Sequence, residues 1–209
     1  MTPATHRVAV AAVGFTVKSG WACAVLLTTS VASPRVLDSR RIELSDPAIP
    51  ESRQPYHAGF GTARDSGQTL TNLVSGVKRF GGDALTTLIR GYQTEHRVQG
   101  AGVVVGSLVD PETIANDHIR IHALEGQLFR GVVRDAAVRH DLPCAIWRER
   151  DLYALGAQVL KRHEPKLRAT VAALGRDTDG PWRAEQKAAA LAAWMVLTGP
   201  GLVKRGQVL

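Results

Sequence analysis

Cysteines, aromatic residues and long apolar runs are all scarce in this sequence. Its 209 residues include two cysteines, and 5% of the residues are aromatic. Cys23 and Cys144 lie in apolar segments with no second Cys or His at zinc-finger spacing, which favours buried thiols in a reducing compartment over a disulfide or a catalytic thiol. Lys18 interrupts the N-terminal apolar run before it reaches membrane-spanning length, and no export signal is visible. We therefore expect a cytoplasmic protein that does not enter a membrane.

The motifs of several common enzyme classes are also absent. The sequence contains no Walker-type phosphate loop, no GxSxG nucleophile elbow, no HExxH zinc motif and no paired CxxC. A function must therefore be sought in the fold and in scattered polar residues rather than in a single local motif.

The composition is that of a folded, basic protein. Hydrophobic residues make up 44%, charged residues 22%, and the mean hydropathy is -0.06, which excludes a collagen-like or wholly disordered chain. The length suits one domain, which we place at residues 1–198, followed by a flexible basic tail at 199–209. Lys and Arg number 26 against 19 Asp and Glu, giving a net charge of +7 and a pI near 9.9. This charge favours polyanionic partners such as nucleic acid.

The first part of the chain predicts an antiparallel β-meander. Three apolar, β-branched runs occupy residues 8–16, 21–29 and 36–44, and short turns separate them. The proline-rich stretch at 45–55 has no hydrophobic period and predicts an irregular connection.

A long helical pattern and a buried strand come next. Apolar residues recur at helical spacing between residues 56 and 97, and the pair Gly81 and Gly82 predicts a break or bend in that helix. Residues 101–107 form a continuous apolar run, which is typical of a central strand covered on both faces. Beyond it the sequence predicts a helix at 117–140, a strand at 144–148, and helices at 152–160, 165–174 and 182–197, the last of them alanine-rich.

The predicted element order is β-β-β-α-β-α-β-α, an α/β fold with a mixed five-stranded sheet and helices on both faces. This order resembles the ribonuclease H-like superfamily, which includes RNase H, RuvC-type Holliday-junction resolvases, transposases and retroviral integrases. The resemblance covers residues 7–197. The segment Val13-Gly-Phe-Thr-Val-Lys-Ser-Gly-Trp-Ala is similar to the first-strand turn of RuvC-like proteins.

The resemblance implies a nuclease in which carboxylates hold two divalent metal ions, Mg²⁺ or Mn²⁺, against the phosphodiester. In that superfamily the acids lie at the end of the first strand, at or just after the fourth strand, and on the final helix. Here these places carry Thr16, then Gly106 and Ser107, and a helix whose acid is Glu185. Asp110 and Glu185 could be surviving catalytic acids, so the sequence predicts a degenerate or altered nuclease site.

A second group of polar residues lies on the predicted helix at 117–140. His118, His122 and Glu125 fall within roughly a 60° sector that heads a buried face. They could form a metal or phosphate site, with Glu125 also a candidate catalytic acid, if His57 or Asp110 completes the ligand set. Alternatively they form a structural cluster, with the histidines bonded to loop carbonyls and Glu125 paired with a buried Arg or Lys.

Three cations are candidates for binding phosphate. Arg183 and Lys187 lie at the start of the last helix, and Lys18 lies in the first hairpin turn. The alternative is a solvated helix end with a snorkelling Lys187 and a hairpin tip that carries Lys18 for solubility.

These observations leave three functions open. The first is a nucleic-acid-binding protein of RNase H-like fold with a degenerate or altered nuclease site. The second is a non-catalytic assembly protein that forms a homodimer through apolar helices. The third is a metal-dependent nuclease that uses His118, His122 and Glu125, with Asp110 or Glu185.

Overall fold

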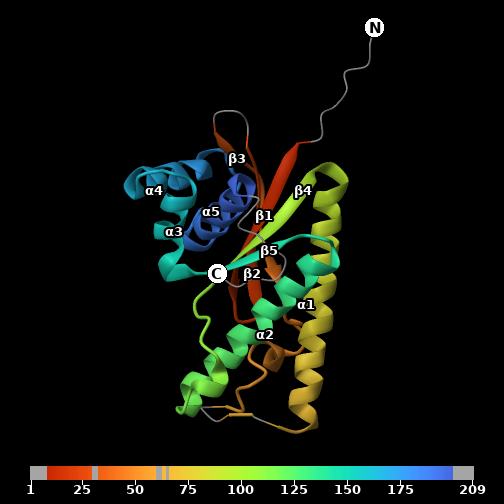
Figure 1. Cartoon of the computed structure of the whole chain (residues 1–209). Coiled ribbons are helices and arrows are strands. Elements are labelled where there is room, and N and C mark those ends of the chain that lie inside the picture. Colours follow the sequence, from red (N-terminus) through yellow and green to blue (C-terminus); the bar gives the residue numbers. More distant parts are fainter. Residues whose placement is uncertain (1–8, 30–32, 60–62, 65, 200–209) are drawn as a thin grey trace.

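The computed structural model describes residues 9–29, 33–59, 63–64 and 66–199. Its centre is one five-stranded sheet in the order β3-β2-β1-β4-β5 (Figure 1). The first three strands pair antiparallel, whereas β4 runs parallel to β1 and β5 parallel to β4. This topology confirms the predicted meander and the central place of the fourth strand. The strands are β1 (Val10–Lys18), β2 (Trp21–Thr29), β3 (Pro34–Glu43), β4 (Arg97–Val105) and β5 (Cys144–Arg148).

Helices cover both faces of the sheet, as predicted (Figure 1). Alternate residues of β1 point to opposite faces: Val13 and Phe15 pack under α1 and α2, and Ala12 packs under α5. The helices are α1 (Gln68–Glu95), α2 (Asp117–Arg139), α3 (Leu152–Val159), α4 (Glu164–Ala173) and α5 (Ala184–Thr198). Short 3₁₀ turns are η1 (Pro50–Arg53), η2 (Pro111–Thr113), η3 (Glu149–Asp151) and η4 (Leu174–Asp177).

The alanine-rich helix α5 lies directly on the sheet because both partners lack bulky side chains. A Cβ atom at Gly14 of β1 would lie 1.8 Å from the Ala189 carbonyl oxygen, and one at Gly102 of β4 would lie 2.9 Å from the Ala192 carbonyl oxygen. Such approaches are possible only for glycine. The contact fixes the start of α5 over the carboxyl end of β1.

The predicted break in the first long helix is wrong. Helix α1 runs through Gly81 and Gly82 without interruption. Both glycines are buried, and a Cβ at Gly81 would lie 2.9 Å from the Leu44 carbonyl oxygen and 3.0 Å from Val132 Cγ1. The glycines therefore allow close packing of the helix against its neighbours, which the sequence pattern alone does not distinguish from a bend.

Both cysteines are buried and unpaired, as predicted. Burial raises the pKa of Cys23 and of Cys144 to about 12, which keeps both thiols protonated and unreactive at neutral pH. Among the described helices, none is long and apolar enough to span a bilayer. The predicted basic tail lies outside the described residues from residue 200 onward.

Candidate functional site

The carboxyl end of β1 carries a buried hydroxyl at the place where the resemblance implies an acid. Thr16 is 1% exposed, and its hydroxyl donates a hydrogen bond of 2.9 Å to the carbonyl oxygen of Glu185 in the first turn of α5. The Thr16 side chain thus fastens the helix to the strand. It supplies no negative charge that could hold a metal ion.

The two other implied acid positions do not complete a carboxylate cluster. Strand β4 is followed by the exposed residues Gly106 and Ser107, and Asp110 accepts a 3.1 Å hydrogen bond from the Glu112 backbone N–H as the cap of η2. Glu185 is half-buried, close enough to raise the pKa of the Cys23 thiol. No three His, Cys, Asp or Glu side chains within the described part of the chain are arranged to hold a metal ion. The residues at this edge therefore do not fit the pair of metal ions that the resemblance implies.

A pocket of about 290 Å³ lies at this same edge, between the β1–β2 turn, the end of β4 and α2. Its nitrogen-bearing side chains are Lys18, His122 and Arg130, and its hydroxyl groups come from Ser19 and Ser107. None of its described lining residues is acidic. The pocket thus offers hydrogen-bond donors and positive charge, which suit a phosphate group rather than a bare metal ion.

The two permanent cations of the pocket are held differently. Arg130 donates a 3.3 Å hydrogen bond from Nη1 to the Ser107 carbonyl oxygen. Burial and the neighbouring Arg134 lower its pKa, although a guanidinium remains charged at any physiological pH. Lys18 Nζ lies 3.0 Å from Glu149 Oε2, and these side chains are 33% and 38% exposed. Such an exposed ion pair is weak, so an incoming anion can compete for the ammonium group.

The other predicted phosphate-binding residues lie elsewhere. Arg183 is exposed and Lys187 is half-buried at the start of α5, and neither lines the pocket. The Arg183 backbone N–H donates a 2.9 Å hydrogen bond to Gln186 Oε1, which caps the helix. Of the three cations predicted from the sequence, the structure places Lys18 in the pocket and adds Arg130, which sequence reasoning missed. Arg130 follows His122 on the same helix by two turns, and that spacing could have indicated it.

Glu125 is the buried acid of a second cluster on α2, next to the pocket, since its helix neighbours Ala123 and Gly126 line that pocket. Its side chain is 1% exposed, and its Oε1 accepts a 2.9 Å hydrogen bond from the Tyr56 backbone N–H. His57 Nδ1 lies 3.3 Å from the same oxygen. Glu125 Oε2 is buried and has no hydrogen-bond partner among the described residues. Burial raises the pKa of Glu125 to about 7, and the hydrogen bond from Tyr56 partly opposes this shift.

Three imidazoles form a chain of contacts that begins at this carboxyl group. His118 Nε2 and His122 Nε2 are 3.3 Å apart, and the ring centroids of His57 and His122 are 5.2 Å apart. The prediction that His118 and His122 are buried is wrong: both are exposed, because the N-terminal half of α2 extends beyond the sheet (Figure 1). Burial and the two neighbouring histidines lower the pKa of His57.

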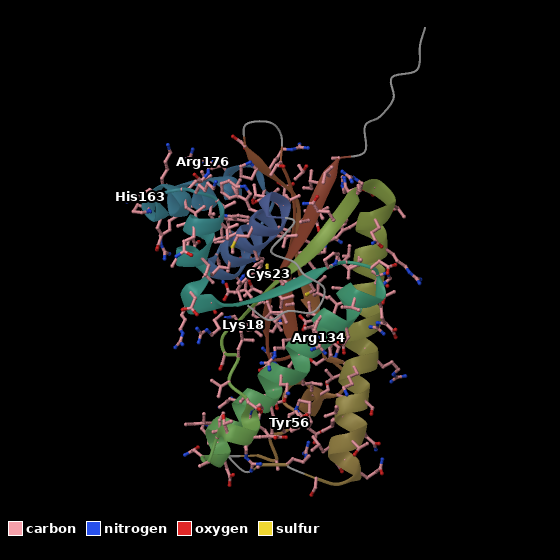
Figure 2. All side chains as sticks on the ribbon, viewed as in Figure 1. Lys18, Cys23, Tyr56, Arg134, His163 and Arg176 are labelled. Carbon is pink, nitrogen blue, oxygen red and sulfur yellow. The ribbon has the colours of Figure 1, made fainter. Side chains whose placement is uncertain are left out.

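The alternative prediction, a structural cluster around Glu125, is wrong about the partner of this carboxyl group. Glu125 pairs with a backbone N–H and an imidazole rather than with a buried Arg or Lys. The structure does not gather the three predicted catalytic acids. Glu125 lies beside Tyr56 in the N-terminal half of α2, whereas Glu185 lies near Cys23 on the other face of the sheet (Figure 2).

Comparisons with known proteins identify the fold. No protein-family model and no curated protein matches the sequence. Among solved structures, Thermus thermophilus RuvC in complex with a Holliday junction substrate superposes with a TM-score of 0.56 at 12% identity, covering 93% of this chain and 98% of that one. Another Thermus thermophilus RuvC structure gives a TM-score of 0.51 at 12% identity, covering 91% and 95%. The chain has the ribonuclease H-like fold, in the variant that RuvC also adopts.

Proposed function

We propose that this protein binds nucleic acid through the cationic pocket at the carboxyl edge of β1 and β4. We further propose that it does not cleave phosphodiesters by the two-metal reaction of the nucleases that share its fold. The observation that carries both statements is the charge of the residues at this edge of the sheet. A hydroxyl, Thr16, stands at the implied acid position of β1, and the pocket at the end of β4 is lined by Lys18 and Arg130 and by no described acid.

The chemistry of the lining supports a phosphate ligand. An ammonium, a guanidinium and two serine hydroxyls can each donate a hydrogen bond to a phosphate oxygen, and charge-assisted bonds of this kind are the stronger ones. Contacts to the backbone phosphates position a nucleic acid without reading its sequence. The pocket therefore supports binding that depends on backbone shape and salt more than on base sequence.

Two further observations support a nucleic acid as the polyanion. The net charge of +7 favours accumulation of polyanions around the protein. The RuvC structure that it resembles was solved with a Holliday junction substrate, which makes a four-way DNA junction the first ligand to test. The predicted homodimer would present two such pockets to one junction.

The test compares binding and cleavage on the same labelled substrates. A four-way junction, a duplex and a single strand of matched sequence are incubated with the protein in Mg²⁺, in Mn²⁺ and in chelator. Native gels report binding, and denaturing gels report strand cleavage. We expect retarded complexes in all three buffers and intact strands in all of them.

A matched pair of variants assigns the binding to the pocket. The double substitution Lys18→Ala with Arg130→Ala removes two charges from the pocket, and Lys78→Ala with Arg79→Ala removes two exposed charges from α1. We expect binding to weaken at least tenfold in the first variant and much less in the second. Absence of binding by the native protein would overturn the proposal. So would metal-dependent cleavage that Glu185→Gln abolishes, because it would show that a carboxylate site is active.

A further inference from the structure

We propose that His57, His118 and His122 bind one zinc ion, with Glu125 acting as the carboxylate that orients His57. This site lies beside the pocket, and the inference does not depend on nucleic-acid binding. It revises the ligand set predicted from the sequence, since Glu125 becomes a positioning residue and His57 takes its place as the third ligand. We call these four residues the histidine cluster.

The first step is the spacing of the two histidines on α2. His118 Nε2 and His122 Nε2 lie 3.3 Å apart, four residues apart on one helix. Two nitrogens that each lie about 2.0–2.1 Å from a tetrahedral zinc ion are separated by about 3.3 Å. The two imidazoles already present their nitrogens at the spacing that a shared ion requires.

The second step is the position of His57. Its ring centroid lies 5.2 Å from that of His122, and two imidazoles on one tetrahedral zinc ion have centroids about 5 Å apart. Its Nδ1 faces Glu125 Oε1 at 3.3 Å. A hydrogen bond from Nδ1 to this carboxylate leaves the Nε2 lone pair free for a metal ion. His57 thus lies at a distance from His122 that suits a shared ion, and a proton on its Nδ1 would leave Nε2 to bind that ion.

The third step is the environment of Glu125. This carboxyl group is 1% exposed, is fixed by the Tyr56 backbone N–H, and has a buried Oε2 with no partner among the described residues. Ligating histidines commonly donate their second N–H to such a carboxylate, which fixes the ring and makes it more basic. A divalent cation held by His57 would also offset the cost of burying the negative charge.

Binding requires the rings to turn from the positions described. As they stand, no three metal-binding side chains in the described ranges meet around one point. His118 and His122 are exposed, so their rings can turn and an ion can reach them from solvent. We expect the ion to draw these rings towards His57, which Glu125 holds in place, and to leave a fourth position for water.

The donor set selects the metal. Imidazole nitrogens favour Zn²⁺ and its neighbours in the first transition series, whereas Mg²⁺ and Mn²⁺ prefer oxygen ligands. The ion would link the segment around His57 to α2. His122 also lines the phosphate pocket, so a bound zinc ion would add positive charge to the margin of that pocket.

The experiment titrates the full-length, chelator-treated protein with Zn²⁺ and records the melting temperature. A ligand that binds only the folded state raises this temperature, and the rise grows with the logarithm of the ligand concentration divided by Kd. We expect the rise to disappear in His118→Ala and His122→Ala, whose exposed side chains are not needed for folding, and to persist in His163→Ala, an exposed histidine on the far side of the molecule (Figure 2). Absence of a rise in the native protein, or its persistence in His122→Ala, would overturn the proposal.

Two further variants separate a ligand from a positioning residue. His57→Ala should weaken zinc binding as strongly as His118→Ala, and Glu125→Gln should weaken it by roughly 10- to 100-fold. Replacement of Zn²⁺ by Co²⁺ should give the visible absorption of a four-coordinate ion in the native protein and in Glu125→Gln. If His57→Ala binds zinc as the native protein does, or if Glu125→Gln changes the coordination number, His57 is not the third ligand and the proposal fails.

Discussion

The hydroxyl of Thr16 donates a hydrogen bond to the Glu185 carbonyl oxygen over 2.9 Å, and this bond joins the end of β1 to the first turn of α5. In the superfamily that this chain resembles, the strand position is expected to carry a metal-binding acid. Here its side chain is 1% exposed and serves the packing of the helix instead. At this position the side chain is therefore part of the structural core.

Replacing the buried hydroxyl should therefore affect stability. Thr16→Val removes the donor and leaves the Glu185 carbonyl oxygen without it, so the free energy of unfolding should fall by about 1–3 kcal/mol. Thr87→Val, on the exposed surface of α1, should change it by less than about 0.5 kcal/mol. Urea unfolding of the three proteins measures the difference. Equal stability of Thr16→Val and the native protein would show that the bond has no structural role.

The contact between sheet and helix should be intolerant of a single methyl group. In Gly14→Ala the new Cβ would lie 1.8 Å from the Ala189 carbonyl oxygen, so α5 must move away from β1. We expect a loss of at least about 3 kcal/mol, at the upper end of overpacking effects. Gly76→Ala, in α1 with nothing near its Cβ, should instead stabilise the protein by about 0.5–1 kcal/mol. Thermal unfolding of both variants measures the loss of stability expected for Gly14→Ala and the gain expected for Gly76→Ala. A Gly14→Ala protein of native stability would contradict the close packing of α5 on β1.

The buried carboxyl group should make stability depend on pH. Burial raises the pKa of Glu125 from 4.5 to about 7, so the folded protein holds this proton where the unfolded chain has released it. The resulting destabilisation is absent below pH 4.5, grows as the pH rises and is complete above pH 7. It should reach on the order of 3 kcal/mol.

Glu125→Gln isolates this effect, because the amide keeps an oxygen for the Tyr56 N–H but cannot ionise. The lowered pKa of His57 makes stability fall as the pH drops below 6.5, which is opposite to the effect of Glu125. Both proteins contain His57, so the comparison between them isolates Glu125. In chelator, the variant should gain stability relative to the native protein between pH 5 and pH 8. Unfolding curves that shift in parallel for the two proteins would mean that Glu125 is ionised throughout this range.

The fold was predictable because its signals are local and agree with one another. The apolar runs that became β1, β2 and β4 are bounded by turns, and their order restricts the topology to few arrangements. Gly81 and Gly82 misled the prediction because a glycine can mark either a bend or a close approach. Only the position of Leu44 beside the helix decides between these two roles.

The candidate site was less predictable because its parts come from distant segments. The helical spacing of His118, His122 and Glu125 is visible in the sequence, but their burial depends on where the sheet ends beneath α2. His57 follows a proline-rich connection without any period, so only the fold brings it to Glu125. Arg130 shares a helix with His122, but its place in the pocket depends on its position opposite Ser107, which only the fold determines.

The salt dependence of DNA binding tests the central claim most directly. Each phosphate contact made by a lysine or arginine contributes about 0.7–0.9 to the slope of log Kobs against log salt concentration. The account predicts that Lys18→Ala with Arg130→Ala reduces the magnitude of this slope by roughly 1–2 relative to the native protein, and that Lys78→Ala with Arg79→Ala leaves it unchanged. An unchanged slope in the pocket variant, together with a reduced slope in the α1 variant, would contradict the account and place the nucleic acid on another surface.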